Sequence, residues 1–227
     1  MAEDKNKETV LPEPDRIEIY AKCILEFIKT NQTAIAVAIS ALVLAALVIS
    51  GVIYFQNRAE EKAQTMLGKA ISQAEAAQRS NSPEAIYEQV KPKFEEIIKK
   101  YGSTAAGKAA LLKYADIAYQ TSDYDTAIEM YQKALDAYDN NGELKSFILN
   151  GLAYSYESKD DYKQAAEYFN RIVNDKSSVM KDQALYNLGR IYGKMGESEK
   201  QQDAYNRIVS DYPDSMYYQL AKEKLAG

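Results

Sequence analysis

The stretch LYNLGRIYGKMGESEKQQDAYNRIV, residues 185–209, decides the fold of this chain. Two earlier stretches align with it without a gap: LNGLAYSYESKDDYKQAAEYFNRIV at 149–173 and LLKYADIAYQTSDYDTAIEMYQKAL at 111–135. Their starts lie 38 and 36 residues apart. Each stretch has two runs of apolar residues at helical spacing, separated by a short polar turn, which predicts a helix pair. Repetition at this spacing indicates a stack in which neighbouring pairs bury a common core.

Two positions recur in all three stretches. A small residue recurs in the first helix, at Ala115, Ala153 and Gly189. An aromatic residue recurs in the second helix, at Tyr131, Phe169 and Tyr205. Small residues allow two helices to cross closely, and large aromatic side chains fill the remaining space. Most of the 19 tyrosines fall on repeat positions, so we interpret them mainly as core residues with a polar tip.

On these residues the three stretches resemble tetratricopeptide repeats, and Pro213 follows the third stretch where that motif has a proline. The resemblance implies an all-α fold, a tetratricopeptide-repeat α-solenoid. Residues 103–227 would hold three tetratricopeptide repeats plus a C-terminal capping helix, which we expect over 215–226. The chain departs from the motif at Ala118, in place of a tyrosine, and at Gln201, in place of an alanine. The second departure predicts looser packing in the third helix pair.

Residues 56–102 are predicted to form a linker helix and half a repeat. Good helix formers follow Phe55, and the sequence SNSP at 80–83 ends this helix and begins the next. Pro92 lies inside the second helix, so we expect a kink or a break near it.

The uncharged stretch AIAVAISALVLAALVISGVIYF, residues 34–55, is predicted to be a transmembrane helix. Twelve of its 22 residues are Leu, Ile, Val or Phe. As a helix it is about 33 Å long, against about 30 Å for the hydrocarbon core of a bilayer, and its insertion is favoured by about 4–7 kcal/mol. The alternative is a core helix of a soluble domain, but the rest of the sequence is polar and repetitive and offers no apolar surface to pack against it. A cleaved signal is disfavoured because the run is long and no small-residue cleavage site follows Phe55.

Two further segments precede this stretch. Residues 15–33 are predicted to form an amphipathic juxtamembrane helix, whose apolar stripe includes Ile17, Ile24 and Ile28. This helix either lies in the membrane interface or extends the anchor, and the sequence leaves both interpretations open. Residues 1–14, MAEDKNKETVLPEP, are charged and lack periodicity, so we expect a disordered tail.

The composition excludes several classes of function. Histidine is absent and Cys23 is the single cysteine, which removes His or Cys metal sites and most nucleophile–base pairs. We therefore expect no enzyme activity, no catalytic or metal-binding residues, no cofactor and no small-molecule substrate. The net charge is −2 before the apolar stretch and −3 after it, so nucleic acid is not an expected partner.

The expected binding surface is the concave side of the repeats, which the first helix of each pair would line. Counting along those helices selects a mixed aromatic and amide set as the protein-binding groove: Leu112, Asp116, Tyr119, Phe147, Asn150, Tyr154, Tyr186, Asn187 and Arg190. Some tetratricopeptide domains hold a C-terminal carboxylate with Lys, Asn and Arg, but here Leu112, Asp116 and Asn150 occupy those places. The alternative is that the groove holds only the chain's own flanking helix.

The order of segments, with EIYAKCILEFIKTNQTAIAVAI at 18–39 leading into the anchor, resembles the ancillary SecYEG translocon subunits, the YfgM-like proteins of the bacterial inner (cytoplasmic) membrane. The resemblance implies a single-pass protein with a cytoplasmic N-terminus and a periplasmic repeat domain that assists protein export and folding at the Sec translocon. The implied partners are SecYEG, a membrane-anchored periplasmic chaperone, exported clients and the lipid bilayer. Flanking Lys and Arg residues are balanced and do not decide the orientation, although Cys23 suits a reducing side.

A second interpretation is a scaffold. The segment YPDSMYYQLAKEKL, residues 212–225, resembles the repeat ends of outer-membrane assembly and Tol-associated coordinator proteins. Such proteins organise envelope complexes, but they usually carry a lipid anchor or a cleaved signal, and this sequence shows neither.

Overall fold

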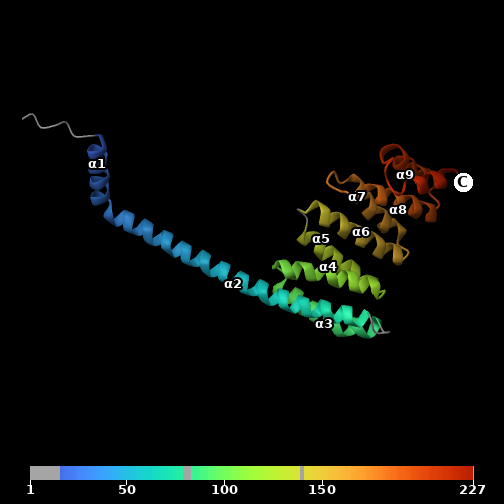
Figure 1. The fold of residues 1–227 in the computed structure, drawn as a ribbon, viewed down its shortest axis with the longest axis horizontal. Helices are drawn as coiled ribbons and strands as arrows, with labels where there is room; N and C mark the ends of the chain where they lie inside the picture. Colours follow the sequence, from blue (N-terminus) through green and yellow to red (C-terminus); the bar gives the residue numbers. More distant parts are fainter. Residues whose placement is uncertain (1–15, 79–82, 139–140, 227) are drawn as a thin grey trace, which may run out of the picture. The chain divides into compact units, whose positions relative to one another are not determined.

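The computed structural model of this chain describes residues 16–78, 83–138 and 141–226 (Figure 1). These residues form ten α-helices and no strand, which confirms the predicted all-α fold. The predicted disordered tail, residues 1–14, lies outside the described residues. The chain divides into two units, residues 1–55 and 56–227.

The first unit contains α1 (Arg16–Thr30) and the beginning of α2 (Gln32–Gln78). α1 ends where the Thr30 hydroxyl donates a hydrogen bond to the Glu26 carbonyl at 2.8 Å. Every side chain of α1 is exposed, including large apolar ones. α2 is the one described helix that is long and apolar enough to cross a membrane, judged by length and composition. The rest of the chain does not bury this apolar stretch, so the helix could serve as a membrane anchor.

The second unit begins with the remainder of α2 and with α3 (Pro83–Tyr101). α3 continues through Pro92, so of the expected kink or break, the break does not occur. An interior proline costs about 3 kcal/mol. Val90, Phe94 and Ile97 are all fully buried around it, and each such side chain contributes about 1.5–3 kcal/mol on burial. Packing therefore keeps the helix continuous.

Three helix pairs follow, and their helices lie side by side in chain order (Figure 1). The pairs are α4 (Ala105–Gln120) with α5 (Tyr124–Ala137), α6 (Gly142–Ser158) with α7 (Tyr162–Asn174), and α8 (Lys181–Lys194) with α9 (Ser198–Asp211). The second helix of each pair also packs on the helix that follows it, so neighbouring pairs share buried surface.

The turn inside each pair is built the same way. One residue has a positive φ, 62° at Ser122, 59° at Asp160 and 74° at Gly196. Only glycine adopts this conformation without a steric cost. In the first two pairs the next residue, Asp123 or Asp161, accepts a hydrogen bond from a backbone N–H and caps the second helix.

The buried side chains form two clusters that meet at α6. Ile148 and Leu152 belong to the first cluster, with α2 to α5, whereas Leu149 and Ala153 belong to the second, with α7 to α10. The recurring small and aromatic residues of the repeats are all buried, at Ala115, Ala153, Gly189, Tyr131, Phe169 and Tyr205. Gln201 is accommodated next to Gly193, where an added Cβ would lie 2.6 Å from Gln201 Nε2, so a glycine provides the space that the larger amide needs.

The last helix, α10 (Tyr218–Ala226), begins three residues after the predicted start at Ser215. The Ser215 hydroxyl accepts a hydrogen bond from the Tyr217 N–H at 3.0 Å and donates one to Asp182 Oδ2 at 2.5 Å. This turn satisfies the backbone locally and delays the helix. Ala221 is fully buried and belongs to the second cluster, so α10 covers the end of that core.

Glu60 of α2 caps a different helix. Its Oε2 accepts a hydrogen bond from the Ala105 N–H at 2.7 Å, and its Oε1 accepts one from the Ala106 N–H at 3.1 Å. Both N–H groups belong to the first turn of α4 and have no partner within that helix. The negative charge also lies at the positive end of the α4 dipole, so Glu60 fastens α2 to the first repeat.

We expect Glu60→Gln to lower the free energy of unfolding by about 1 kcal/mol, because glutamine keeps one acceptor oxygen and loses the charge. Thermal unfolding of the full chain in detergent micelles, followed by circular dichroism, measures this loss. Glu61→Gln makes the same change at the exposed neighbouring position and should be neutral. Equal losses in the two variants would contradict a specific capping role.

Candidate functional site

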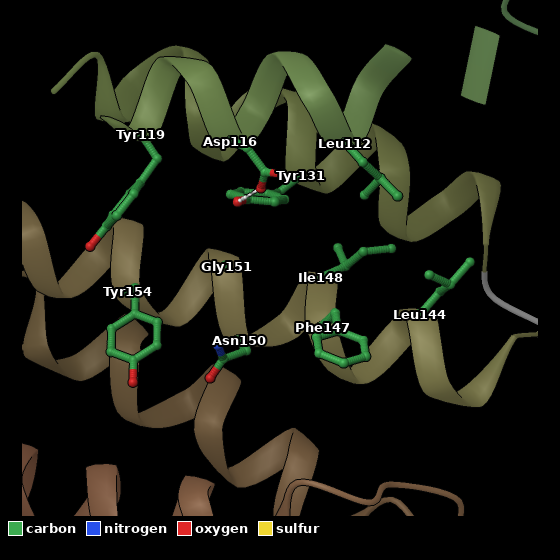
Figure 2. A pocket seen from close by; sticks show the side chains of 10 residues that line it. All are labelled: Leu112, Asp116, Tyr119, Tyr131, Leu144, Phe147, Ile148, Asn150, Gly151 and Tyr154. Carbon is green, nitrogen blue, oxygen red and sulfur yellow. Dashed lines mark hydrogen bonds between the residues drawn. The ribbon is translucent and has the colours of Figure 1, made fainter. Parts of the chain in front are cut away.

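An open pocket of about 370 Å³ lies between α4 and α6, with part of α5 at its base (Figure 2). Its described lining residues all lie on these three helices: Leu112, Asp116, Tyr119, Tyr131, Leu144, Phe147, Ile148, Asn150, Gly151 and Tyr154. Six of the nine predicted groove residues are among them. No residue of α2 lines the pocket, so the flanking helix does not fill it.

One end of the pocket is apolar. Leu112 of α4 faces Leu144, Phe147 and Ile148 of α6 across it (Figure 2). Ile148 is buried in the first core cluster, whereas Phe147 is 57% exposed. A large aromatic side chain left in solvent at the edge of an apolar pocket is a surface that gains free energy when a ligand covers it.

Tyr131 of α5 forms the base of the pocket, and Gly151 allows it to approach. A Cβ at position 151 would lie 2.5 Å from Cζ of the Tyr131 ring. The Tyr131 hydroxyl donates a hydrogen bond to Asp116 Oδ1 at 2.6 Å. Burial, and then this bond to the carboxylate, raise the pKa of Tyr131 above its usual value, so the hydroxyl stays protonated and holds Asp116 in place.

The other end of the pocket carries polar and aromatic groups. Tyr119 of α4 faces Tyr154 and Asn150 of α6 (Figure 2). The Tyr154 ring meets Phe169 edge-on, with centroids 5.5 Å apart, and its hydroxyl accepts a hydrogen bond from Asn187 Nδ2 at 2.9 Å. The position of Tyr154 is therefore fixed from the side opposite the pocket, which lowers the ordering cost of a ligand contact.

The three remaining predicted groove residues, Tyr186, Asn187 and Arg190, lie on α8 and do not line this pocket. Tyr186 stacks on Tyr217, with ring centroids 5.0 Å apart. Asn187 is only 4% exposed and bridges Tyr154 and Arg190. These three side chains are engaged by other parts of the chain, and Asn187 holds Tyr154 of the pocket through its hydrogen bond.

Arg190 belongs to an ion-pair network centred on Glu157 of α6. Its Nη1 and Nη2 donate hydrogen bonds to Glu157 Oε1 and Oε2, each at 2.9 Å, and Lys194 Nζ donates one to Oε1 at 3.0 Å. The Glu157 side chain is 11% exposed. Burial acts to raise its pKa, but the hydrogen bonds and charges of Arg190 and Lys194 outweigh burial and lower the pKa below its usual value.

We expect Glu157→Gln to cost about 1.5 kcal/mol of unfolding free energy at neutral pH, because hydrogen bonds to charged groups contribute about 1.5–3 kcal/mol. Folding lowers the pKa of Glu157, so its stabilisation is complete above the ordinary value of 4.5 and disappears as the pH falls through the lower folded value. The stability gap between the wild type and the variant should therefore be constant down to about pH 5 and narrow below it. Urea unfolding at a series of pH values measures the gap. A gap that is unchanged in acid would contradict the role of the ionised carboxylate.

Counting from the repeat motif missed Tyr131, Leu144, Ile148 and Gly151. The last three lie on the same face of α6 as Phe147 and Tyr154, at helical spacing, so a signal was present in the sequence. The aligned stretch begins at residue 149, whereas α6 begins at Gly142, so Leu144 and Ile148 precede the residues that the repeat alignment compares. Within the described residues, no group of three or more His, Cys, Asp or Glu side chains could hold a metal ion.

Residues 108–178 and 183–215 each match a family model described as tetratricopeptide repeat. These two regions include α4 to α9 almost completely. The repeats are therefore tetratricopeptide repeats, which form a protein–protein interaction module, and the matches indicate no catalytic family.

Two similar proteins cover different shares of this chain. Tetratricopeptide repeat protein 1 of Schizosaccharomyces pombe is 32% identical over 102 residues, which are 42% of this chain and 10% of that protein. Photosystem I assembly protein Ycf3 of Synechococcus sp. is 28% identical over 123 residues, which are 52% of this chain and 69% of that protein. The chain thus matches only a tenth of the length of the first relative.

Two solved structures share the fold. The crystal structure of MamA superposes with a TM-score of 0.53 at 16% identity, covering 70% of this chain and 79% of MamA. A tetratricopeptide repeat protein from Parabacteroides merdae gives a TM-score of 0.54 at 15% identity, covering 71% of this chain and 59% of that protein. At these identities the likeness shows the helical repeat architecture alone.

Proposed function

We propose that this protein is a membrane-anchored module that binds a segment of another protein in the pocket between α4 and α6. The observation that carries the proposal is the pocket itself, an aromatic and apolar cavity of about 370 Å³ with Phe147 exposed at its edge. Pockets of this kind bind ligands when a few polar groups fix the orientation, and here Asp116, Tyr119 and Asn150 provide them.

The anchor in this proposal is the apolar part of α2. Its side chains are exposed in the chain, among them Leu44 at 66% and Leu47 at 68%. A row of such side chains is stable in a bilayer and not in water. α1 also exposes its apolar side chains, with Ile17 at 74% and Phe27 at 64%, which suits a helix lying in the membrane interface.

The finer proposal places this module at the Sec translocon of the bacterial inner membrane. The N-terminus would be cytoplasmic and the repeats periplasmic, where they would assist newly exported proteins alongside a membrane-anchored chaperone. The order of amphipathic segment, apolar span, linker and repeats supports this assignment. An aromatic pocket also suits partly folded clients, because they expose apolar segments.

A scaffold for complex assembly is the second candidate. It is favoured by the similarity to the Synechococcus protein named for photosystem I assembly, which extends over 52% of this chain. A scaffold of envelope complexes would hold one fixed partner in the pocket rather than a range of clients.

A photo-crosslinking amino acid at Phe147 in the full-length chain, irradiated in native membranes, tests these alternatives. Phe147 is exposed at the edge of the pocket, so the replacement should not disturb the core. Capture of translocon subunits and many exported proteins supports the first candidate, and capture of one fixed set of envelope subunits supports the scaffold. The control is the same residue at Val179, which is 68% exposed outside the pocket. Identical capture from both positions would overturn the pocket as the binding site.

The proposed orientation is tested by thiol labelling. Cys23 is exposed and is the only cysteine. Because the proposed topology places it on the cytoplasmic side, an impermeant maleimide should not label the wild type in intact spheroplasts. Met216→Cys in a Cys23→Ser background places the thiol on a 79% exposed residue of the repeat unit and should be labelled. The reverse pattern would overturn the proposed topology and the periplasmic location together.

A further inference from the structure

We infer that the pocket between α4 and α6 selects extended peptide segments in which a Lys or Arg lies next to an apolar side chain, with the cation at Asp116. This inference rests on the proposed function, since it specifies the ligand of the same pocket. Asp116 is the only charged residue among the ten that line the pocket. A buried or half-buried carboxylate surrounded by apolar and aromatic groups attracts a cation more strongly than one in water.

The Asp116 carboxylate is positioned for a ligand. Its Oδ1 accepts the hydrogen bond from Tyr131, which points it toward the space between α4 and α6 (Figure 2). A carboxylate has about four acceptor sites, so one hydrogen bond leaves capacity for a charged donor. Among the ion pairs found within the described parts of the chain, none involves Asp116.

The groups on either side of Asp116 define the rest of the ligand. Leu112 and Phe147 lie toward one end of the pocket and can cover an aliphatic or aromatic side chain (Figure 2). Tyr119 and Tyr154 lie toward the other end, where their rings can contact the stem or the charge of a Lys or Arg. A volume of about 370 Å³ is near the lower limit for small-ligand pockets, so it suits one or two side chains of a longer segment.

The same geometry disfavours acidic ligands. A peptide carboxylate that entered the pocket would meet Asp116, and like charges brought together out of water repel strongly. Among the described residues that line the pocket, no Lys or Arg is present to offset this repulsion. Charge complementarity therefore commits the pocket to basic segments.

The test uses the full chain in nanodiscs of neutral phosphatidylcholine, with empty nanodiscs as the blank. Short fluorescein-labelled peptides on a Gly-Ser background carry Leu-Lys, Leu-Gln, Leu-Glu or Ser-Lys pairs, and fluorescence anisotropy reports binding. We expect the Leu-Lys peptide to bind about tenfold more tightly than Leu-Gln, as one charge-assisted hydrogen bond predicts, and Leu-Glu to bind weakest. Ser-Lys should bind more weakly than Leu-Lys, because the apolar contact is lost.

Asp116→Asn should lower the affinity for the Leu-Lys peptide about tenfold and leave the affinity for the Leu-Gln peptide unchanged. Asparagine keeps an oxygen that can accept the Tyr131 hydrogen bond, so the base of the pocket is retained. The matched control is Asp136→Asn, at an exposed position of α5 outside the pocket. Phe147→Ala changes an exposed residue and should weaken all the leucine-containing peptides without changing their order.

Equal binding of Leu-Lys and Leu-Glu to the wild type, or an unchanged preference in Asp116→Asn, would overturn the inference. If no peptide binds while Phe147 crosslinks proteins in membranes, the charge selection is wrong and the proposed function stands. If the peptides bind in the expected order while Phe147 captures no protein, the selection stands and the proposed function is wrong.

Discussion

Gly107→Ala is expected to lower the free energy of unfolding by about 3 kcal/mol, because its added Cβ would make the shortest contact at any described glycine. A Cβ at this position would lie 1.9 Å from the Tyr101 carbonyl oxygen, 2.5 Å from the Tyr101 carbonyl carbon and 2.9 Å from Gly102 Cα. All three are backbone atoms. No side chain can rotate away to relieve the overlap, so the main chain between α3 and α4 would have to move.

That movement is costly because the turn is already fixed by hydrogen bonds. The Gly107 N–H donates to Thr104 Oγ1 at 3.0 Å, and the Thr104 hydroxyl donates to the Tyr101 carbonyl at 2.7 Å. Shifting Tyr101 away from position 107 would break this cap of α4. For the second unit of 172 residues, a loss of about 3 kcal/mol corresponds to a decrease in melting temperature of about 6–12 °C.

Thermal unfolding of the full chain by circular dichroism measures the decrease. Gly68→Ala is the matched control, because an added Cβ there would meet no atom within 4 Å. Alanine is the better helix former by about 1 kcal/mol, so Gly68→Ala should be neutral or stabilising. If both variants have the same melting temperature as the wild type, the Tyr101 backbone does not approach α4 as closely as described.

The fold was predictable from the sequence because its signals are local and repeated. The small and aromatic residues, such as Ala153 and Phe169, recur once in each repeat and are all buried in the structure. Deviations arose where contacts between distant residues decide the outcome. α3 continues through Pro92 because its neighbours are buried in a core that the helix alone does not reveal.

The pocket was predictable only in part, for a related reason. Helical periodicity selected Leu112 of α4 and Tyr154 of α6, and both line the pocket. It could not show that Glu157 binds Arg190 from 33 residues away, or that Tyr217 covers Tyr186, because neither pair has a fixed spacing in the repeat. The base of the pocket depends on Tyr131 approaching Gly151 across two helices, which also has no local signal.

Leu44→Lys combined with Val48→Lys is expected to abolish membrane retention, the largest effect of any change considered. Both residues lie near the middle of the apolar part of α2 and are exposed, at 66% and 58%. Each central lysine costs about 2.5–3.5 kcal/mol of insertion free energy, and each lost apolar residue removes a further 0.3–0.6 kcal/mol or so. The total of about 6–8 kcal/mol is comparable to or larger than the entire favourable insertion energy of about 4–7 kcal/mol.

The measurement is the fraction of the chain that remains with membranes after extraction at alkaline pH. Gln202→Lys with Asn206→Lys adds the same charges at the same spacing to exposed positions of α9 and should stay fully in the membrane fraction. Because the repeat unit has its own two core clusters, the released double-lysine chain should keep its helical repeat structure in solution. Full retention of the Leu44 and Val48 variant would mean that α2 does not anchor the chain, and the binding module would then have to reach the membrane through a partner.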